Sequence, residues 1–152
     1  MQFMNNYSNR ELNIWAELIL DILVSFYFFP KIFPLIIDGQ LYSDALVGII
    51  ATSIILAIVY SIVVFGAINA LTKREEKDER DYIYELKSYR ISNIISQVSI
   101  YLLISLIVFN PINQVRLNEF TAPMIAMLLL IITLLSSTGK SLTQLFNYRK
   151  NI

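Results

Sequence analysis

Two groups of carboxylates are the side chains in this sequence best suited to chemistry, and the first lies in an apolar stretch. Glu17 and Asp21 are one helical turn apart, and a carboxylate inside a membrane helix is a functional-site hypothesis by default. Asp21 needs hydrogen-bond donors there, and Asn93, Gln97 and Tyr101 of a later apolar stretch are the donors we expect. Proton or cation coupling through Asp21 is one interpretation. A hydrogen bond that fixes helix pairing is the other, which we favour because no cationic partner of Asp21 is evident.

The second group of carboxylates lies in residues 72–90, which hold six of the twelve Lys and Arg and six of the twelve Asp and Glu. Asp78, Asp81 and Glu85 share one face of a helix by their spacing of three and four. Hard divalent cations prefer such oxygen ligands. Helical spacing gives an open strip of carboxylates and not a cage, so we expect a solvated face with ion pairs and no metal site.

The same segment has two further interpretations. Arg80, Lys87 and Arg90 could anchor lipid phosphates, although interleaved acids weaken that reading because a lipid-binding patch is usually mostly basic. A mixed-charge helix fits docking to another protein through complementary charges better. We therefore predict that the segment is an interaction helix, and its proposed contact residues are Asp78, Arg80, Asp81, Glu85 and Arg90.

Composition excludes several classes of chemistry. The chain has no Cys and no His, which removes disulfides, thiol chemistry, Cys/His zinc sites and catalysis by histidine. No metalloprotease motif, nucleophile elbow or Gly-rich phosphate loop is present. The net charge is zero, which gives no electrostatic basis for binding nucleic acid. We expect a protein that is not an enzyme, with no catalytic residues and no cofactor.

The elements that position these residues are apolar runs long enough to cross a bilayer. Residues 45–71, 91–115 and 120–139 carry no charged side chain, and about 20 apolar residues span the hydrocarbon core as a helix. We predict an all-α fold, a single membrane domain over residues 1–152 built as a four-transmembrane-helix bundle with a helical cytoplasmic loop at 72–90. Its spans cover approximately residues 12–37, 45–71, 91–110 and 120–138.

The first span differs from the others because it contains charges and prolines. Pro30 and Pro34 are expected to kink the outer part of this helix or to end it. The alternative is that residues 1–30 lie along the membrane surface. We favour the spanning arrangement because it places most cations on one side.

Helix faces give two expectations about packing. Ser53, Ala57 and Ser61 recur every four residues, and small side chains on one face let helix backbones approach closely in a membrane. A polar stripe of the same spacing follows in the third span and consists of Asn93, Gln97, Tyr101 and Ser105.

Charge distribution predicts the orientation of four spans. Both termini and residues 72–90 then share one side, which carries ten Lys and Arg, whereas the other side carries only Lys31 and Arg116. Positive charge accumulates on the cytoplasmic side. We therefore expect a multi-pass protein of the cell (inner or plasma) membrane with cytoplasmic N- and C-termini.

One local pattern resembles a known group of proteins. Asp78-Glu79-Arg80-Asp81, followed by Tyr89-Arg90 at the start of an apolar run, resembles small prokaryotic integral membrane proteins of unknown function that have a "DERD…YR" loop between two spans. The resemblance covers about 20 residues and the hydropathy profile. It implies a bacterial membrane protein and gives weight to Asp78, Arg80, Asp81 and Arg90, but it implies no activity.

These observations favour a function based on binding. We expect a regulatory, accessory or immunity-type factor that acts through residues 72–90 and the bundle surface. Its expected partners are the lipid bilayer and either further copies of itself, as a homo-oligomer, or a larger membrane protein. The alternative is a small oligomeric channel or transporter, or a pore-forming membrane effector, that uses Asp21.

Overall fold

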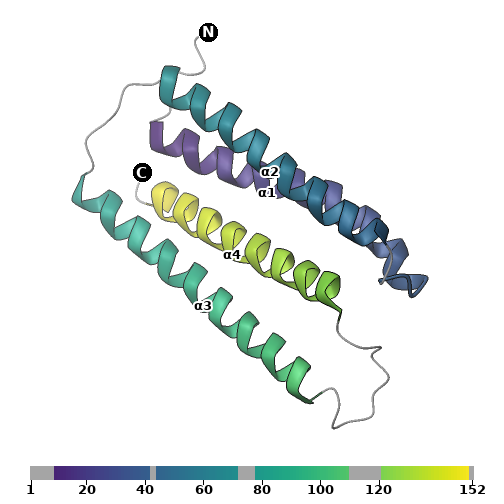
Figure 1. The fold of residues 1–152 in the computed structure, drawn as a ribbon. Helices are drawn as coiled ribbons and strands as arrows, with labels where there is room; N and C mark the ends of the chain where they lie inside the picture. The colour runs from purple at the N-terminus through teal and green to yellow at the C-terminus, as the bar shows by residue number, and fades with distance from the viewer. Residues whose placement is uncertain (1–8, 42–43, 72–77, 110–120, 151–152) are drawn as a thin grey trace.

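A computed structural model describes residues 9–41, 44–71, 78–109 and 121–150 of the chain. Four helices make up these residues: α1 (Asn9–Ile37), α2 (Asp44–Leu71), α3 (Glu79–Phe109) and α4 (Ala122–Lys150). Successive helices run in opposite directions (Figure 1). The starts of α1 and α3 and the ends of α2 and α4 therefore meet at one end of the molecule, which we call the charged end.

All four helices are long and apolar enough to cross a membrane. The all-α prediction is therefore confirmed, and the four candidate spans indicate a multi-pass membrane protein in contact with a lipid bilayer. Helices α1, α3 and α4 extend beyond the predicted apolar spans at the charged end, whereas α2 ends at Leu71 as predicted. Helix α3 begins at Glu79, so the second half of the predicted loop is part of this helix, and α4 continues without interruption to Lys150.

Local sequence accounts for where two of the helices begin and end. Asp78 caps α3, because its Oδ1 accepts a 2.7 Å bond from the Glu79 amide while Oδ2 of Asp81 accepts a 3.0 Å bond from the Asp78 amide. Helix α1 ends in a turn at Gly39, whose φ of 66° suits glycine. Pro30 and Pro34 lie inside α1 and do not end it.

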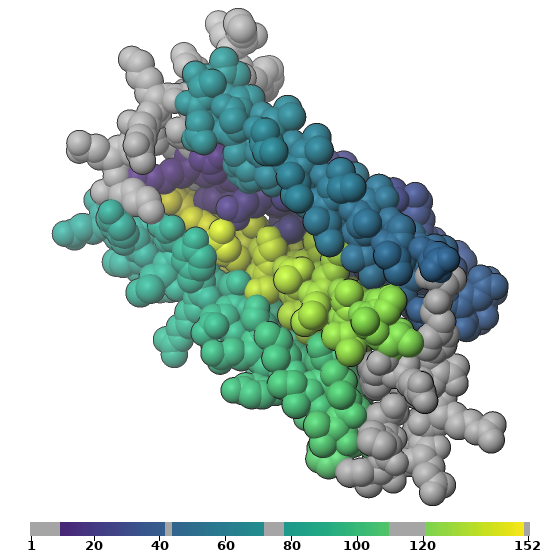
Figure 2. All heavy atoms as spheres, in the orientation of Figure 1, coloured from purple at the N-terminus to yellow at the C-terminus, as the bar shows by residue number. Residues whose placement is uncertain are grey.

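The helices form an open arrangement in which α1 and α4 are central. Helix α2 packs on α1 and more lightly on α4, whereas α3 packs along α4 and contacts α1 at its start, through the ion pair of Asp81 with Arg10. Among the described helices, α2 and α3 do not pack on each other. Figure 2 shows α4 in a trough between α2 and α3. Buried positions recur along α1 from Ile14 to Ile32, so one face of α1 packs lengthwise against the other helices.

Two apolar clusters hold the helices together. The larger one lies away from the charged end and comes from α1, α2 and α4; its buried members are Phe28, Ile32, Leu46, Ile50 and Met127. The smaller one lies at the charged end, where Ile14 and Leu18 of α1 pack against Leu145 of α4. The polar residues predicted to carry chemistry lie between these clusters and at the charged end.

Candidate functional site

The charged end contains a polar network that joins three helices. Arg10 of α1 forms an ion pair with Asp81 of α3, and the Tyr148 hydroxyl of α4 donates a 2.6 Å hydrogen bond to Oδ1 of Asp81. The Arg10 and Asp81 side chains are less than one fifth exposed. Asp81 therefore faces the bundle, in addition to its part in capping α3.

A second ion pair lies deeper in the bundle, between α1 and α4. The Lys140 ammonium donates bonds of 2.9 and 3.1 Å to the two carboxylate oxygens of Glu17. Ser141 adds a longer contact of 3.4 Å to the same carboxylate, and the Tyr89 ring lies 5.0 Å from the Lys140 ammonium. Lys140 thus meets an anion and an aromatic face together, which favours a partly buried cation.

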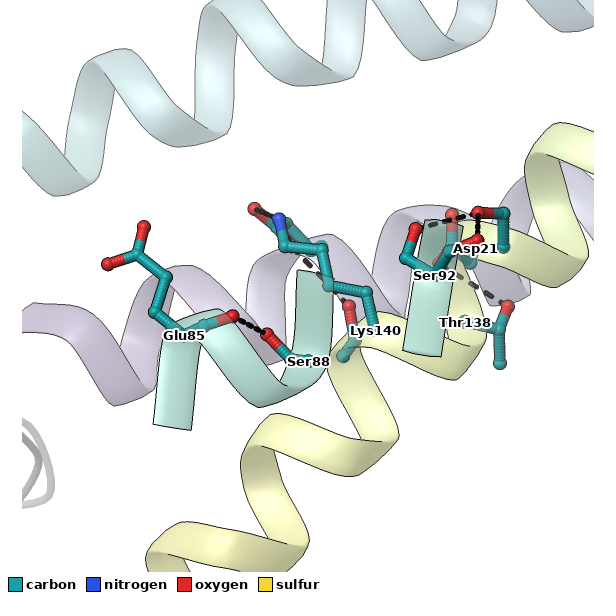
Figure 3. Close-up of polar contacts among 9 residues, drawn as sticks. Asp21, Glu85, Ser88, Ser92, Thr138 and Lys140 are labelled. Carbon is teal, nitrogen blue, oxygen red and sulfur yellow. Dashed lines mark hydrogen bonds and ion pairs between the residues drawn. The ribbon is translucent and has the colours of Figure 1, made fainter. Parts of the chain in front are cut away.

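Asp21 lies one helical turn beyond Glu17 and is 5% exposed. The Thr138 hydroxyl donates a 3.3 Å hydrogen bond to Oδ2 of Asp21. Figure 3 shows Lys140, Thr138 and Asp21 following one another where α1 and α4 run together. The partner of Asp21 therefore comes from α4, whereas the expected donors Asn93, Gln97 and Tyr101 are exposed on α3.

A small cavity connects the two ion pairs. Its volume is about 180 Å³, and its charged lining consists of the carboxylates of Glu17, Asp81 and Glu85 and the cations of Arg10 and Lys140. The line of polar groups continues from this cavity to Asp21. It ends there, because the next buried layer toward the opposite end is the larger apolar cluster around Phe28 and Met127.

Hydroxyl groups and a glycine bring α3 and α4 into close contact. Ser136 of α4 lies 2.7 Å from the Ser92 hydroxyl and 2.8 Å from the Ser96 hydroxyl. A Cβ on Gly139 would lie 2.5 Å from Cδ1 of Ile95. The absence of a side chain at Gly139 therefore permits the short separation between these helices.

The proposed interaction residues separate into two groups by orientation. Asp81 and Glu85 turn toward the bundle and line the cavity, and Asp78 caps the helix. Arg80 and Arg90 are exposed on the opposite side of α3. Among the described residues of this segment, the exposed charged side chains include both acids and bases: Asp78, Glu79, Arg80, Lys87 and Arg90. Residues 72–77 of the predicted loop, and Arg116, lie outside the described residues.

The polar stripe predicted for the third span points away from the bundle. Asn93, Gln97 and Tyr101 are exposed, with Tyr101 exposed by 67%. Ser105 is also exposed and donates a 2.8 Å bond to the Tyr101 carbonyl of its own helix. The side chains of Asn93 and Gln97 form no hydrogen bond with any other residue in the described part of the chain. We call Asn93, Gln97 and Tyr101 the outer stripe.

The carboxylates do not assemble as metal ligands within the described ranges. Among the described residues, no group of three Asp or Glu side chains has a geometry suited to a metal ion. Asp81 and Glu85 lie on the cavity side of α3, whereas Asp78 is exposed and precedes the helix. Asp78 caps the helix and Asp81 pairs with Arg10.

Sequence reasoning missed the residues that complete the polar network. Tyr148 and Thr138 were not among the residues expected to carry chemistry, and Arg10 and Lys140 counted only among the ten Lys and Arg of the predicted cytoplasmic side. A signal was present for one contact: Ser88, Ser92 and Ser96 recur every four residues. That spacing predicts a face for close helix packing, and Ser88 is fully buried.

Comparison with known proteins adds no identification. No protein-family model, curated protein or solved structure matches the chain. Functional inference therefore rests on the geometry described above.

Proposed function

We propose that this chain is a non-enzymatic membrane protein, a regulatory, accessory or immunity-type factor, that binds another membrane protein along the outer face of α3. The bound protein is either a second copy or a larger membrane partner. The observation that carries the proposal is the outer stripe of Asn93, Gln97 and Tyr101, which is exposed on a helix whose packing contacts are with α4.

The outer stripe has a physical cost if it faces lipid. Hydrocarbon offers no hydrogen bonds, so an exposed amide in a span is unfavourable unless a protein group or interfacial water satisfies it. Hydrogen bonds between membrane helices contribute about 0.6–2 kcal/mol each. A partner helix beside Asn93 and Gln97 would supply such bonds and cover the neighbouring apolar side chains of Ile94 and Val98, which are half exposed.

The start of α3 extends this surface beyond the apolar run. We propose that the charged end faces the cytoplasm, because ten of the twelve Lys and Arg lie on that side. Arg80 is exposed there, and Leu86 is 72% exposed. A partner that contacts α3 in the membrane can therefore also contact an apolar and cationic surface in the cytoplasm.

Site-specific photo-cross-linking in native membranes tests this proposal. A photoreactive residue replaces Ile94, which lies beside the outer stripe and is 50% exposed; the matched control replaces Ile54 of α2, which is 49% exposed. We expect a protein adduct from position 94 and lipid adducts alone from position 54. An adduct of twice the chain mass indicates a second copy, and any other mass indicates a larger partner.

The decisive variant removes the amides. Asn93→Leu combined with Gln97→Leu should reduce the adduct from position 94 by about tenfold. The reason is that loss of two interhelical hydrogen bonds weakens association by about 1–3 kcal/mol, which corresponds to a factor of about ten in affinity. Thr52→Val is the control, because this exposed hydroxyl already bonds to the Gly48 carbonyl of its own helix. Equal protein adducts at positions 94 and 54, or no effect of the double substitution, would contradict the proposal.

The alternative function is transport of protons or cations through Asp21. The line of polar groups from the cavity through Glu17 and Lys140 to Asp21 favours it. The larger apolar cluster beyond Asp21 opposes it, since a single copy offers no polar route onward. Proton and potassium flux into liposomes distinguishes the two functions. Flux that disappears in Asp21→Asn would support transport and count against a purely binding role.

A further inference from the structure

A second surface feature lies between α3 and α4 at the charged end, apart from the cavity and the outer stripe. It is a groove of about 660 Å³. One side is basic, from Lys87 and Arg90 of α3; the apolar lining comes from Ile91 of α3 and from Leu142 and Phe146 of α4. The groove therefore combines two cations with an apolar floor.

The two cations have no anionic partner in the described part of the molecule. Lys87 and Arg90 are exposed, and the ion pairs that the described residues form belong to Arg10 and Lys140. The acids that interleave with them in sequence turn away, since Asp81 and Glu85 line the cavity on the bundle side of α3. The groove side of α3 is thus locally basic, although residues 72–90 as a whole are neutral.

The apolar lining is also uncovered. Phe146 is 66% exposed and Leu142 is 53% exposed, and both follow the uncharged run that ends at residue 139. Binding of a ligand that removes such apolar surface from water is favourable, because burial of apolar surface lowers the free energy. Lys87 and Arg90 immediately precede the uncharged run that begins at Ile91. They therefore lie at the depth where lipid phosphates are found.

We propose that this groove binds one anionic phospholipid. Lys87 and Arg90 contact the phosphate, and the first part of an acyl chain lies against Leu142 and Phe146. Charge complementarity selects this occupant, because two adjacent cations without an acidic partner suit a phosphate. This site is independent of the protein partner proposed for the outer stripe, since the two surfaces share no residue.

Native mass spectrometry of the full-length protein, released from detergent micelles, tests the proposal. The probes are phosphatidylglycerol, which is anionic, and phosphatidylcholine, which has no net charge and matching acyl chains. We expect one retained phosphatidylglycerol and at least tenfold less retained phosphatidylcholine. Lys87→Gln with Arg90→Gln should reduce phosphatidylglycerol retention about 20-fold, because each cation contributes roughly fivefold to binding of anionic lipid.

A matched pair of substitutions controls for total charge. Arg80→Gln with Lys150→Gln removes the same two charges from exposed residues that do not line the groove, and it should leave lipid retention within about twofold. Phe146→Ser tests the apolar part and should reduce retention of phosphatidylglycerol by roughly tenfold, because the acyl chain loses the apolar area of the Phe146 ring that it would otherwise cover.

Four results would overturn the proposal, and the last of them is a cross-link from the groove to a second protein. The first is equal retention of the two lipids, and the second is an equal loss in the groove variant and the charge control. The third is displacement of the lipid by glycerol phosphate, which would indicate a site for a free anion. Cross-links from the groove to a second protein in place of lipid would identify a protein interface instead.

Discussion

Tyr148, near the end of α4, donates a 2.6 Å hydrogen bond to Asp81 in the first turn of α3. The same carboxylate pairs with Arg10 of α1 and accepts the Asp78 amide at the start of α3. One side chain therefore caps its own helix and links two others. The segment that contains it is held as an ordered extension of α3.

Removal of the Tyr148 hydroxyl should destabilise the charged end. We expect Tyr148→Phe to lower the free energy of unfolding by about 1.5–3 kcal/mol, the usual contribution of a hydrogen bond to a charged group. Chemical unfolding in detergent measures the change. Tyr101→Phe is the control, because that side chain is exposed on α3 and its loss should leave the isolated chain's stability within about 0.5 kcal/mol. Equal effects of the two substitutions would refute the assigned role of Tyr148.

Glu17 and Lys140 should behave as a coupled pair. Glu17→Gln or Lys140→Met alone leaves a partly buried charge without its partner, and we expect each to cost about 1–3 kcal/mol. The double substitution should cost less than the sum of the two, with a coupling energy of at least about 0.5 kcal/mol in a double-mutant cycle. Additive costs would show that the ion pair contributes nothing to stability.

A side chain at Gly139 should separate α3 from α4. Gly139→Leu places its Cβ in the space of Ile95 and would disturb the contacts of Ser136 with Ser92. We expect a loss of about 1–3 kcal/mol in stability, as in other overpacked contacts. Gly66→Leu is the matched control, since no atom lies within 4 Å of a Cβ at this position. Similar unfolding curves for both variants would contradict the close contact.

The orientation of the chain can be tested with single cysteines because the sequence contains none. Arg80→Cys places a thiol at the charged end, and Gln40→Cys places one in the exposed turn after α1. In intact cells a membrane-impermeant maleimide should label position 40 and spare position 80. Permeabilised cells, in which both positions should react, provide the control. The reverse pattern would invert the proposed topology.

The helices could be predicted from sequence because their determinant is local. An uncharged run of 20 or more residues predicts a membrane helix without knowledge of its neighbours. The extension of α3 to Glu79 follows from the capping pair Asp78 and Asp81. The carboxylates Asp81 and Glu85 of α3 could be placed on one face of that helix from their spacing in the sequence alone.

The site could not be predicted because it depends on which helix faces meet. Glu17 and Lys140 are far apart in sequence, and hydropathy does not specify that α1 lies beside α4. Asn93 and Gln97 have the spacing of an inward polar stripe, yet α3 turns its serines toward α4 instead. Small residues permit a closer approach of two helices than amides do, and that difference decides which face of α3 is buried.

The lack of contact between α2 and α3 divides the protein into two helical hairpins. One hairpin consists of α1 and α2, and the other consists of α3 and α4. Each hairpin is held by contacts between its two helices, which are adjacent in sequence. The hairpins meet mainly where α1 lies beside α4, and the ion pairs of Arg10 and Glu17 bridge that boundary. During biogenesis each hairpin can therefore enter the membrane as a unit, and the buried charges are neutralised only when the second hairpin arrives.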